Sequence, residues 1–210
     1  MIAVVKPARR RMSREDRRTQ LLEAAADVLR RPERTALSFE VIAETAGVSP
    51  TLPYKYFDSV DEIAEELYRH LVGEVDRGTD AILADAGQDF DDKVRASLTL
   101  WTDILRRDGI LLLRLTDDAA HPSLRAAVEE RRERAVDVWA AELGRQFDLA
   151  PTTARVVAGA LTAGSIAALR SWLRDRLDRT EVIELFITML RAQIDAALDA
   201  PAPTVTRSRS

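Results

Sequence analysis

Apolar residues recur at helical spacing along nearly the whole chain, and this restricts the fold more than any other feature. Ile63, Leu67, Leu71 and Val75 follow one another at intervals of four, which predicts a long helix with one apolar face. The alternation of apolar and polar residues that marks a β-strand is absent, and Ala, Leu, Arg and Glu dominate. The sequence therefore predicts an all-α fold.

Capping residues divide this pattern into elements. Ser13 and Ser59 have capping-box spacing, Ser38 can cap a short helix, and Gly47 can end that helix in the left-handed conformation. Ser49-Pro50 reads as an N-cap followed by a first-turn proline. About nine helices are expected, over 13–31, 38–46, 49–57, from Ser59 past Val75, 90–107, 110–115, 121–143, 151–173 and 179–198.

Four regions follow from this reading. Residues 1–12 are expected to form a flexible basic arm and residues 13–57 a small three-helix head. Residues 58–200 would form a larger helical body, and the Pro- and Ser-containing stretch 201–210 a disordered tail.

The charges are segregated along the chain. The 210 residues carry 31 Lys and Arg against 35 Asp and Glu, a net charge of -4. Residues 1–57 hold 11 basic and 7 acidic residues, so they are positive, while the remaining 20 and 28 leave the body acidic. A basic head on an acidic body suggests contact with a polyanion, although a solubilising arm explains the charge equally well.

Several classes of site are excluded by composition. The chain has no Cys and only two His, so disulfides, thiol nucleophiles and multi-His metal sites are ruled out, and no metal or cofactor is expected. No Gly-rich phosphate loop or nucleophile elbow is present. The apolar run at residues 1–5 is too short for a signal peptide or a membrane span, so we expect a cytoplasmic protein without a membrane partner.

The most informative stretch runs from Ser38 to Phe57. A short helix, a glycine turn and a second short helix are the parts of a helix-turn-helix, whose second helix enters the DNA major groove. Packing of a small helical head is the alternative role for Tyr54 and Tyr56, and a solvated surface charge is the alternative for Lys55.

Three strings in this region resemble the TetR family of bacterial transcription regulators. They are Arg18-Thr19-Gln20-Leu21-Leu22-Glu23-Ala24-Ala25, Ile42-Ala43-Glu44-Thr45-Ala46-Gly47-Val48-Ser49 and Tyr54-Lys55-Tyr56-Phe57. The resemblance implies a DNA-binding domain over 13–57 and a ligand-binding and dimerisation domain over 58–200. It also implies double-stranded operator DNA as a partner, contacted by Ser38, Ser49, Pro50, Thr51, Leu52, Tyr54, Lys55 and Tyr56.

The sequence departs from the family pattern at two positions. Pro53 stands where an aliphatic residue is usual, and its ring removes a backbone hydrogen bond to Ser49, so we expect a slightly reshaped helix. Val60 stands where a lysine is usual, so one phosphate-neutralising charge is missing. Arginines of the arm and first helix, among them Arg17 and Arg18, are candidates to replace it.

The last two helices suggest a homodimer. Small residues lie along 158–165, and a broad apolar stripe runs from Leu185 to Leu198, a combination suited to a four-helix interface between two subunits. The predicted dimerisation residues are Ala158, Leu161, Gly164, Ser165, Leu185, Met189 and Ile194. The alternative is that these helices bury each other inside one subunit.

Large apolar residues of the middle helices, with a few polar neighbours, are candidates to line a ligand pocket. They are Trp101, Ile104, Leu105, Leu112, Thr116, His121, Trp139 and Thr162. Plain core packing is the alternative for each, and His121 is also explained as a helix-start residue. The apolar bias points to a small, mostly apolar effector.

We therefore expect a sequence-specific, homodimeric transcription regulator, a repressor that ligand binding releases from DNA, and not an enzyme. The alternative is an all-helical small-molecule-binding protein or enzyme whose basic head is incidental.

Overall fold

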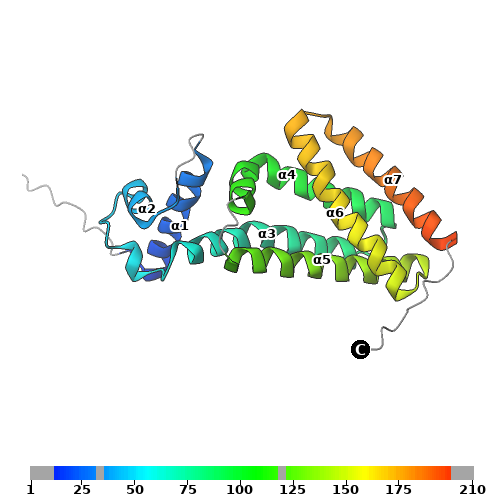
Figure 1. Cartoon of the computed structure of the whole chain (residues 1–210), viewed down its shortest axis with the longest axis horizontal. Coiled ribbons are helices and arrows are strands. Elements are labelled where there is room, and N and C mark those ends of the chain that lie inside the picture. The colour runs from blue at the N-terminus through cyan, green and yellow to red at the C-terminus, as the bar shows by residue number, and fades with distance from the viewer. Residues whose placement is uncertain (1–11, 32–35, 118–121, 200–210) are drawn as a thin grey trace, which may run out of the picture. The chain divides into compact units, whose positions relative to one another are not determined.

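The structure, a computed structural model, describes residues 12–31, 36–117 and 122–199. All regular elements in these ranges are helical, in agreement with the predicted all-α class. They are α1 (Arg14–Arg30), α2 (Phe39–Ala46), the 3-10 helix η1 (Pro53–Lys55), α3 (Val60–Ala84), α4 (Phe90–Asp117), α5 (Pro122–Phe147), α6 (Pro151–Asp175) and α7 (Arg179–Asp199) (Figure 1). Most of the predicted arm, the tail 201–210 and His121 lie outside the described residues.

The predicted count of nine helices is corrected at two places. The expected helices over 90–107 and 110–115 are one helix, α4, which is kinked at Asp108, where φ is -127° and ψ is 16°. The predicted interruption is therefore a local bend. The expected helix over 49–57 is not an α-helix, so the head contains two complete α-helices and a single 3-10 turn.

Proline explains the second correction. Pro53 has no N–H, so it cannot donate to the Ser49 carbonyl in the α-helical pattern. The Leu52 N–H donates to that carbonyl instead, at 2.9 Å, and the Tyr56 N–H donates to Pro53 at 2.9 Å. Both are three-residue hydrogen bonds, and they wind the segment into 3-10 turns rather than the slightly reshaped α-helix expected from the sequence.

The described residues form two compact units, one ending at Leu67 and the other beginning at Tyr68, a boundary that falls within α3. The first unit buries one face of each helix. Its core contains Leu21, Ala25, Val28, Ile42, Phe57 and Ile63, each at most 2% exposed.

The predicted caps set the ends of α1 and α2. Ser13 accepts a hydrogen bond from the Asp16 N–H, and Asp16 accepts one from the Ser13 N–H, which completes a capping box. Ser38 caps α2 through the Val41 N–H at 3.3 Å. Gly47 ends α2 with φ at +65°, a conformation that favours glycine because a side chain would be strained there.

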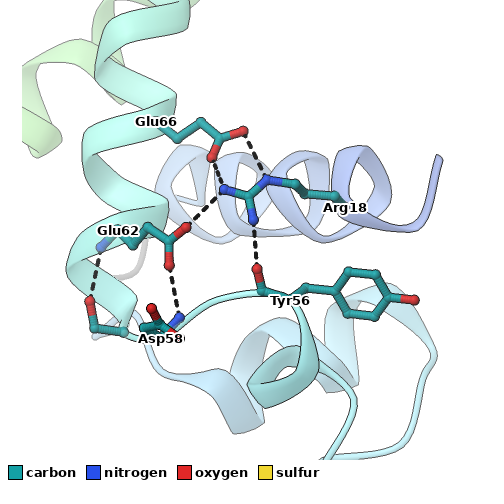
Figure 2. A network of polar contacts seen from close by, with 6 residues as sticks. Arg18, Tyr56, Asp58, Glu62 and Glu66 are labelled. Carbon is teal, nitrogen blue, oxygen red and sulfur yellow. Dashed lines mark hydrogen bonds and ion pairs between the residues drawn. The ribbon is translucent and has the colours of Figure 1, made fainter. Parts of the chain in front are cut away.

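Arg18 joins three segments of the first unit (Figure 2). Its guanidinium donates to Glu62 at 2.9 Å and pairs with both carboxylate oxygens of Glu66, all on the first turns of α3. It also donates to the Tyr56 carbonyl at 2.6 Å and lies 4.1 Å from the centroid of the Phe57 ring. One side chain of α1 therefore fixes both the end of the turn region and the start of α3.

In the second unit, α6 packs against α5 on one side and α7 on the other, while α4 contacts all three helices (Figure 1). Within this mostly apolar interior lies an ion pair. The Lys93 ammonium, 0% exposed, donates to Glu142 at 2.9 Å and to the Leu83 carbonyl at 3.1 Å. Burial alone would raise the pKa of Glu142, but hydrogen bonds from Lys93 and Gln146 outweigh it and lower the pKa.

Among the described residues, α6 alone is long and apolar enough to cross a membrane, by length and composition only. A packed helix of a soluble protein meets the same criteria, and α6 lies between two other helices. A Cβ added at Gly164 would lie 3.0 Å from the Phe186 ring of α7, so this glycine permits close packing within the subunit.

We predict that Arg18→Lys destabilises the first unit by about 1 kcal/mol. Lysine retains the charge but cannot reach two carboxylates and a carbonyl with one planar group, and solvent screening limits the loss because the side chain is one-third exposed. Hydrogen exchange of α1 and α2 amides in the full chain measures the change. Arg30→Lys, at the exposed pair with Asp27, should leave exchange unchanged, and equal acceleration in both variants would contradict this role.

We predict that Glu142→Gln lowers the free energy of unfolding of the second unit by about 3 kcal/mol, because it leaves the Lys93 ammonium buried without a counter-charge. Denaturant unfolding followed by tryptophan fluorescence reports on this unit, since all three Trp residues lie in it. The control Glu184→Gln breaks an exposed pair with Arg95 and should change little. The loss should shrink as the pH falls below the ordinary pKa of glutamate, where the unfolded wild-type chain takes up the proton, and should vanish below the lowered pKa of folded Glu142.

Candidate nucleic-acid interface and ligand cavity

The turn that follows α2 presents a continuous exposed surface. Ser49, Pro50, Thr51, Tyr54 and Lys55 are all exposed in this unit. The backbone beneath them is held in place, because the Val48 N–H donates to Ala43 at 3.0 Å and the Phe57 N–H donates to Pro53 at 3.0 Å. Small hydroxyl side chains and a lysine on a fixed turn can approach a phosphate backbone closely.

Tyr54 belongs both to this surface and to the packing of the head. Its ring meets Phe39 edge-on, with centroids 4.5 Å apart, and its hydroxyl donates to Glu40 at 3.1 Å. The hydrogen bond to Glu40 raises the pKa of Tyr54, so the hydroxyl remains a neutral donor. The residue is still 59% exposed, so packing on α2 leaves much of its side chain accessible to a partner.

The other predicted DNA-contact residues are half-buried: Ser38, Leu52 and Tyr56. The Ser38 hydroxyl accepts the capping hydrogen bond of α2, so it lies at a helix N-terminus, where backbone N–H groups favour anions. The Tyr56 carbonyl accepts from Arg18, while its side chain points away from that network (Figure 2).

Positive charge on this surface is more limited than the sequence suggested. Arg18, considered as a replacement for the missing lysine at position 60, is committed to Glu62, Glu66 and Tyr56. Arg17 donates to Gln20 at 2.6 Å. Among the described residues, no carboxylate forms an ion pair with exposed Lys55, so Lys55 is the cation best placed for a phosphate.

The predicted dimerisation residues differ in their exposure. Ala158, Leu161 and Ile194 are at most 4% exposed and pack inside their own subunit, while Gly164 and Ser165 are half-buried. Leu185 and Met189 are 61% and 55% exposed. Helical rotation explains the division, because residues three or four apart share a face and the buried three lie on the inner one.

An exposed apolar surface lies on α6 and α7. On α6 it follows helical spacing, and Val156 at its start is 69% exposed. The members of this exposed stripe are Val156, Ala160, Ala163, Ile166 and Ala167 on α6 and Leu185, Met189, Ala192 and Ala196 on α7. Ala160 and Ala163 belong to the small-residue stretch 158–165 noted in the sequence, whereas Val156, Ile166 and Ala167 were not predicted, although their helical spacing could have revealed them.

A cavity of about 330 Å³ lies in the second unit between side chains of α3, α4, α5 and α6. Six of the eight predicted ligand-binding residues line it: Trp101, Leu105, Leu112, Thr116, Trp139 and Thr162. Ile104 is 2% exposed and does not line the cavity. His121 lies outside the described residues.

The predicted ligand-binding set did not include several polar residues of the cavity wall, among them Tyr68, Asp76, Ser97 and Arg131. Ser97 could have been found, because it lies on the same helical face as Val94 and Trp101. Arg131 could not, since its partner Asp76 is distant in sequence and belongs to another helix.

Comparison with known proteins identifies the family. No protein-family profile matches the chain. The HTH-type transcriptional activator FasR of Mycolicibacterium smegmatis is 30% identical over 179 residues, 83% of this chain and 81% of FasR.

Solved structures agree on the fold. A TetR-like transcriptional regulator from Rhodococcus sp. RHA1 has a TM-score of 0.73 at 19% identity, covering 88% of this chain and 99% of that one. A TetR-family regulator from Streptomyces coelicolor has a TM-score of 0.70 at 20% identity, covering 87% and 82%. These relatives are regulators rather than enzymes, and together with the helix-turn-helix they establish that the chain belongs to the TetR family as a DNA-binding transcription regulator.

Proposed function

We propose that this regulator binds a pseudo-palindromic operator as a homodimer in the cytoplasm, and that a small, mostly apolar effector releases it. The observation that carries the proposal is the segment from Ser49 to Lys55, which exposes five of its seven residues on a fixed turn directly after the glycine-ended helix α2. A segment that served only core packing would not expose a lysine and a tyrosine side by side.

Each predicted DNA-contact residue has a role in this proposal. Ser49, Pro50, Thr51 and Leu52 approach the major groove, where small side chains allow close contact with base edges. Lys55 and Tyr56 contact phosphates, Tyr54 contacts the backbone or a base, and Ser38 contacts a phosphate at the start of α2. The 3-10 geometry after Pro53 makes the reading element short, so few bases would be read by each subunit.

The exposed stripe supports homodimerisation. A row of small and apolar side chains along α6, continued by Leu185 and Met189 on α7, is the surface a second copy would cover. An isologous dimer presents two heads, which matches two half-sites of a pseudo-palindrome.

The cavity supports effector control. It is mostly apolar with a few polar groups, as is typical of small-molecule sites. The helix α3 begins in the first unit and ends as part of the cavity wall, so a ligand-dependent shift of α3 would alter the spacing of the two heads. By linkage, operator DNA must weaken effector binding by the same factor as effector weakens DNA binding.

The direction of regulation depends on where the operator lies. A site that overlaps a promoter gives repression, which is the mode we propose. Activation is the second candidate, because the relative FasR is named an activator.

Selection of genomic fragments by the purified protein at physiological salt, followed by sequencing, tests the proposal. Enrichment of one pseudo-palindromic site supports it, and the position of that site relative to the promoter separates repression from activation. Absence of any enriched site from effector-free protein would contradict sequence-specific binding.

We predict that Lys55→Ala weakens operator binding and reduces the slope of log affinity against log salt by about 1 per subunit, because one phosphate contact is lost. Titration of operator DNA at several salt concentrations measures both effects. Arg174→Ala removes the same charge from an exposed site of the second unit and should leave the slope unchanged. An unchanged slope in Lys55→Ala would assign this lysine to solvent.

We predict that the double variant Leu185→Glu/Met189→Glu is monomeric and loses operator binding, because carboxylates on the exposed stripe repel across a two-fold axis. Sedimentation velocity gives the oligomeric state, and circular dichroism shows whether each subunit remains folded. Ile110→Glu changes an exposed apolar residue of α4, outside the stripe, and should remain dimeric. A double variant that sediments as a dimer would place the interface elsewhere.

A further inference from the structure

The wall of the cavity in the second unit is apolar over most of its area. Side chains of α4, α5 and α6, among them Leu98, Trp101, Trp139 and Leu169, supply this surface. The volume of about 330 Å³ lies at the lower end of the range for small-molecule sites, so a bound molecule would be compact.

Most charged side chains of the wall already form ion pairs, and the exposed Arg170 is not among these pairs. Arg131 pairs with Asp76 at 2.7 Å, Arg134 with Asp80 at 2.9 Å, and Arg132 with Glu129 at 2.6 Å. Burial raises the pKa of Tyr68, and this is only partly offset by the nearby Arg131, so its hydroxyl stays neutral. A charged ligand would have to compete with these pairs, whereas an uncharged ligand would leave them intact.

Two buried hydrogen-bond donors of the cavity wall lack an acceptor within the described part of the chain. The Ser97 hydroxyl, on a residue only 6% exposed, and the Arg131 Nε–H are both shielded from solvent, and neither has a hydrogen-bonding partner among the residues described. The hydroxyls of Thr162 and Ser165, on the same wall, instead donate to backbone carbonyls at 2.8 and 2.9 Å. Buried donors without acceptors are rare, because leaving them unpaired is costly.

These two groups border the same part of the cavity. Ser97 and Trp101 are four residues apart on α4 and therefore neighbours on one helix face. The Arg131 guanidinium lies over the Trp101 ring, 4.9 Å from its centroid. Ser97 and Arg131 are thus both neighbours of Trp101 in the wall of one cavity.

We propose that the cavity binds a compact apolar molecule carrying one uncharged acceptor oxygen, of the ketone, ester or amide type, which accepts hydrogen bonds from Ser97 and Arg131. This inference rests on the proposed effector control and gives the chemical class of the effector. Apolar contact with the tryptophans supplies affinity, and the two donors select for the acceptor.

Three probes of similar shape test this in the full-length protein by equilibrium dialysis. Benzophenone has a carbonyl oxygen, diphenylmethane has none, and diphenylacetate has a carboxylate. We expect benzophenone to bind about threefold to tenfold more tightly than diphenylmethane, the range for one hydrogen bond to a buried donor. Diphenylacetate should bind no more tightly than benzophenone.

Two matched variants assign the effect to Ser97. Ser97→Ala should reduce the preference for benzophenone, since Arg131 can still donate, while leaving diphenylmethane binding unchanged, which also shows that the cavity is intact. Ser165→Ala makes the same change on the same wall, but its hydroxyl is bonded within α6, so the preference should persist.

Four outcomes would overturn the proposal. The first is equal binding of ketone and hydrocarbon, as expected if ordered water satisfies both donors, and the second is tightest binding of diphenylacetate. The third is an equal loss of the benzophenone preference in Ser97→Ala and Ser165→Ala, and the fourth is no binding of any probe. Selection of genomic DNA with the same preparation distinguishes failure of the proposed ligand class from failure of the proposed function. An enriched operator without a ketone preference overturns only the ligand class, whereas no enriched operator counts against the proposed function.

Discussion

The first unit depends on the Arg18 guanidinium more than on any other single group. It connects α1 to the Tyr56 carbonyl, at the end of the exposed turn, and to Glu62 and Glu66, at the start of α3. Most backbone hydrogen bonds of the turn are of the 3-10 type, which has poorer geometry than the α-helical type. Its orientation is therefore set from outside, by a side chain of another helix that is also held over the Phe57 ring.

The second unit uses charge differently. Lys93 and Glu142 form an ion pair in the interior, where α4, α5 and the end of α3 meet, so the pair specifies how these helices are arranged. The cavity wall repeats this strategy, with Asp76 and Arg131 neutralising each other beside an apolar surface.

The sequence predicted the local structure well wherever short-range chemistry determines it. Ser13, Ser38 and Gly47 end or begin helices as expected, because a capping side chain and a left-handed glycine act within a few residues. The α-helix predicted over 49–57 was wrong in type. Pro53 changes the hydrogen bonding of the turns before and after it, and not only that of the first turn of a helix. Six of the eight predicted ligand-binding residues line the cavity, because apolar residues on middle helices face inward.

By itself, the sequence determined the helical class, the helix-turn-helix motif and the family, since these depend on periodicity, capping and a specific string of residues. Tertiary structure alone decided which apolar faces are covered within a subunit. Ala158 and Ile194 lie inside, whereas Leu185 and Met189 lie outside, although all four belong to the same two helices. It also decided that Arg18 serves the head rather than DNA and that Ser97 and Arg131 border one cavity. Such contacts join residues far apart in sequence, and packing in three dimensions selects among the partners that each side chain could reach.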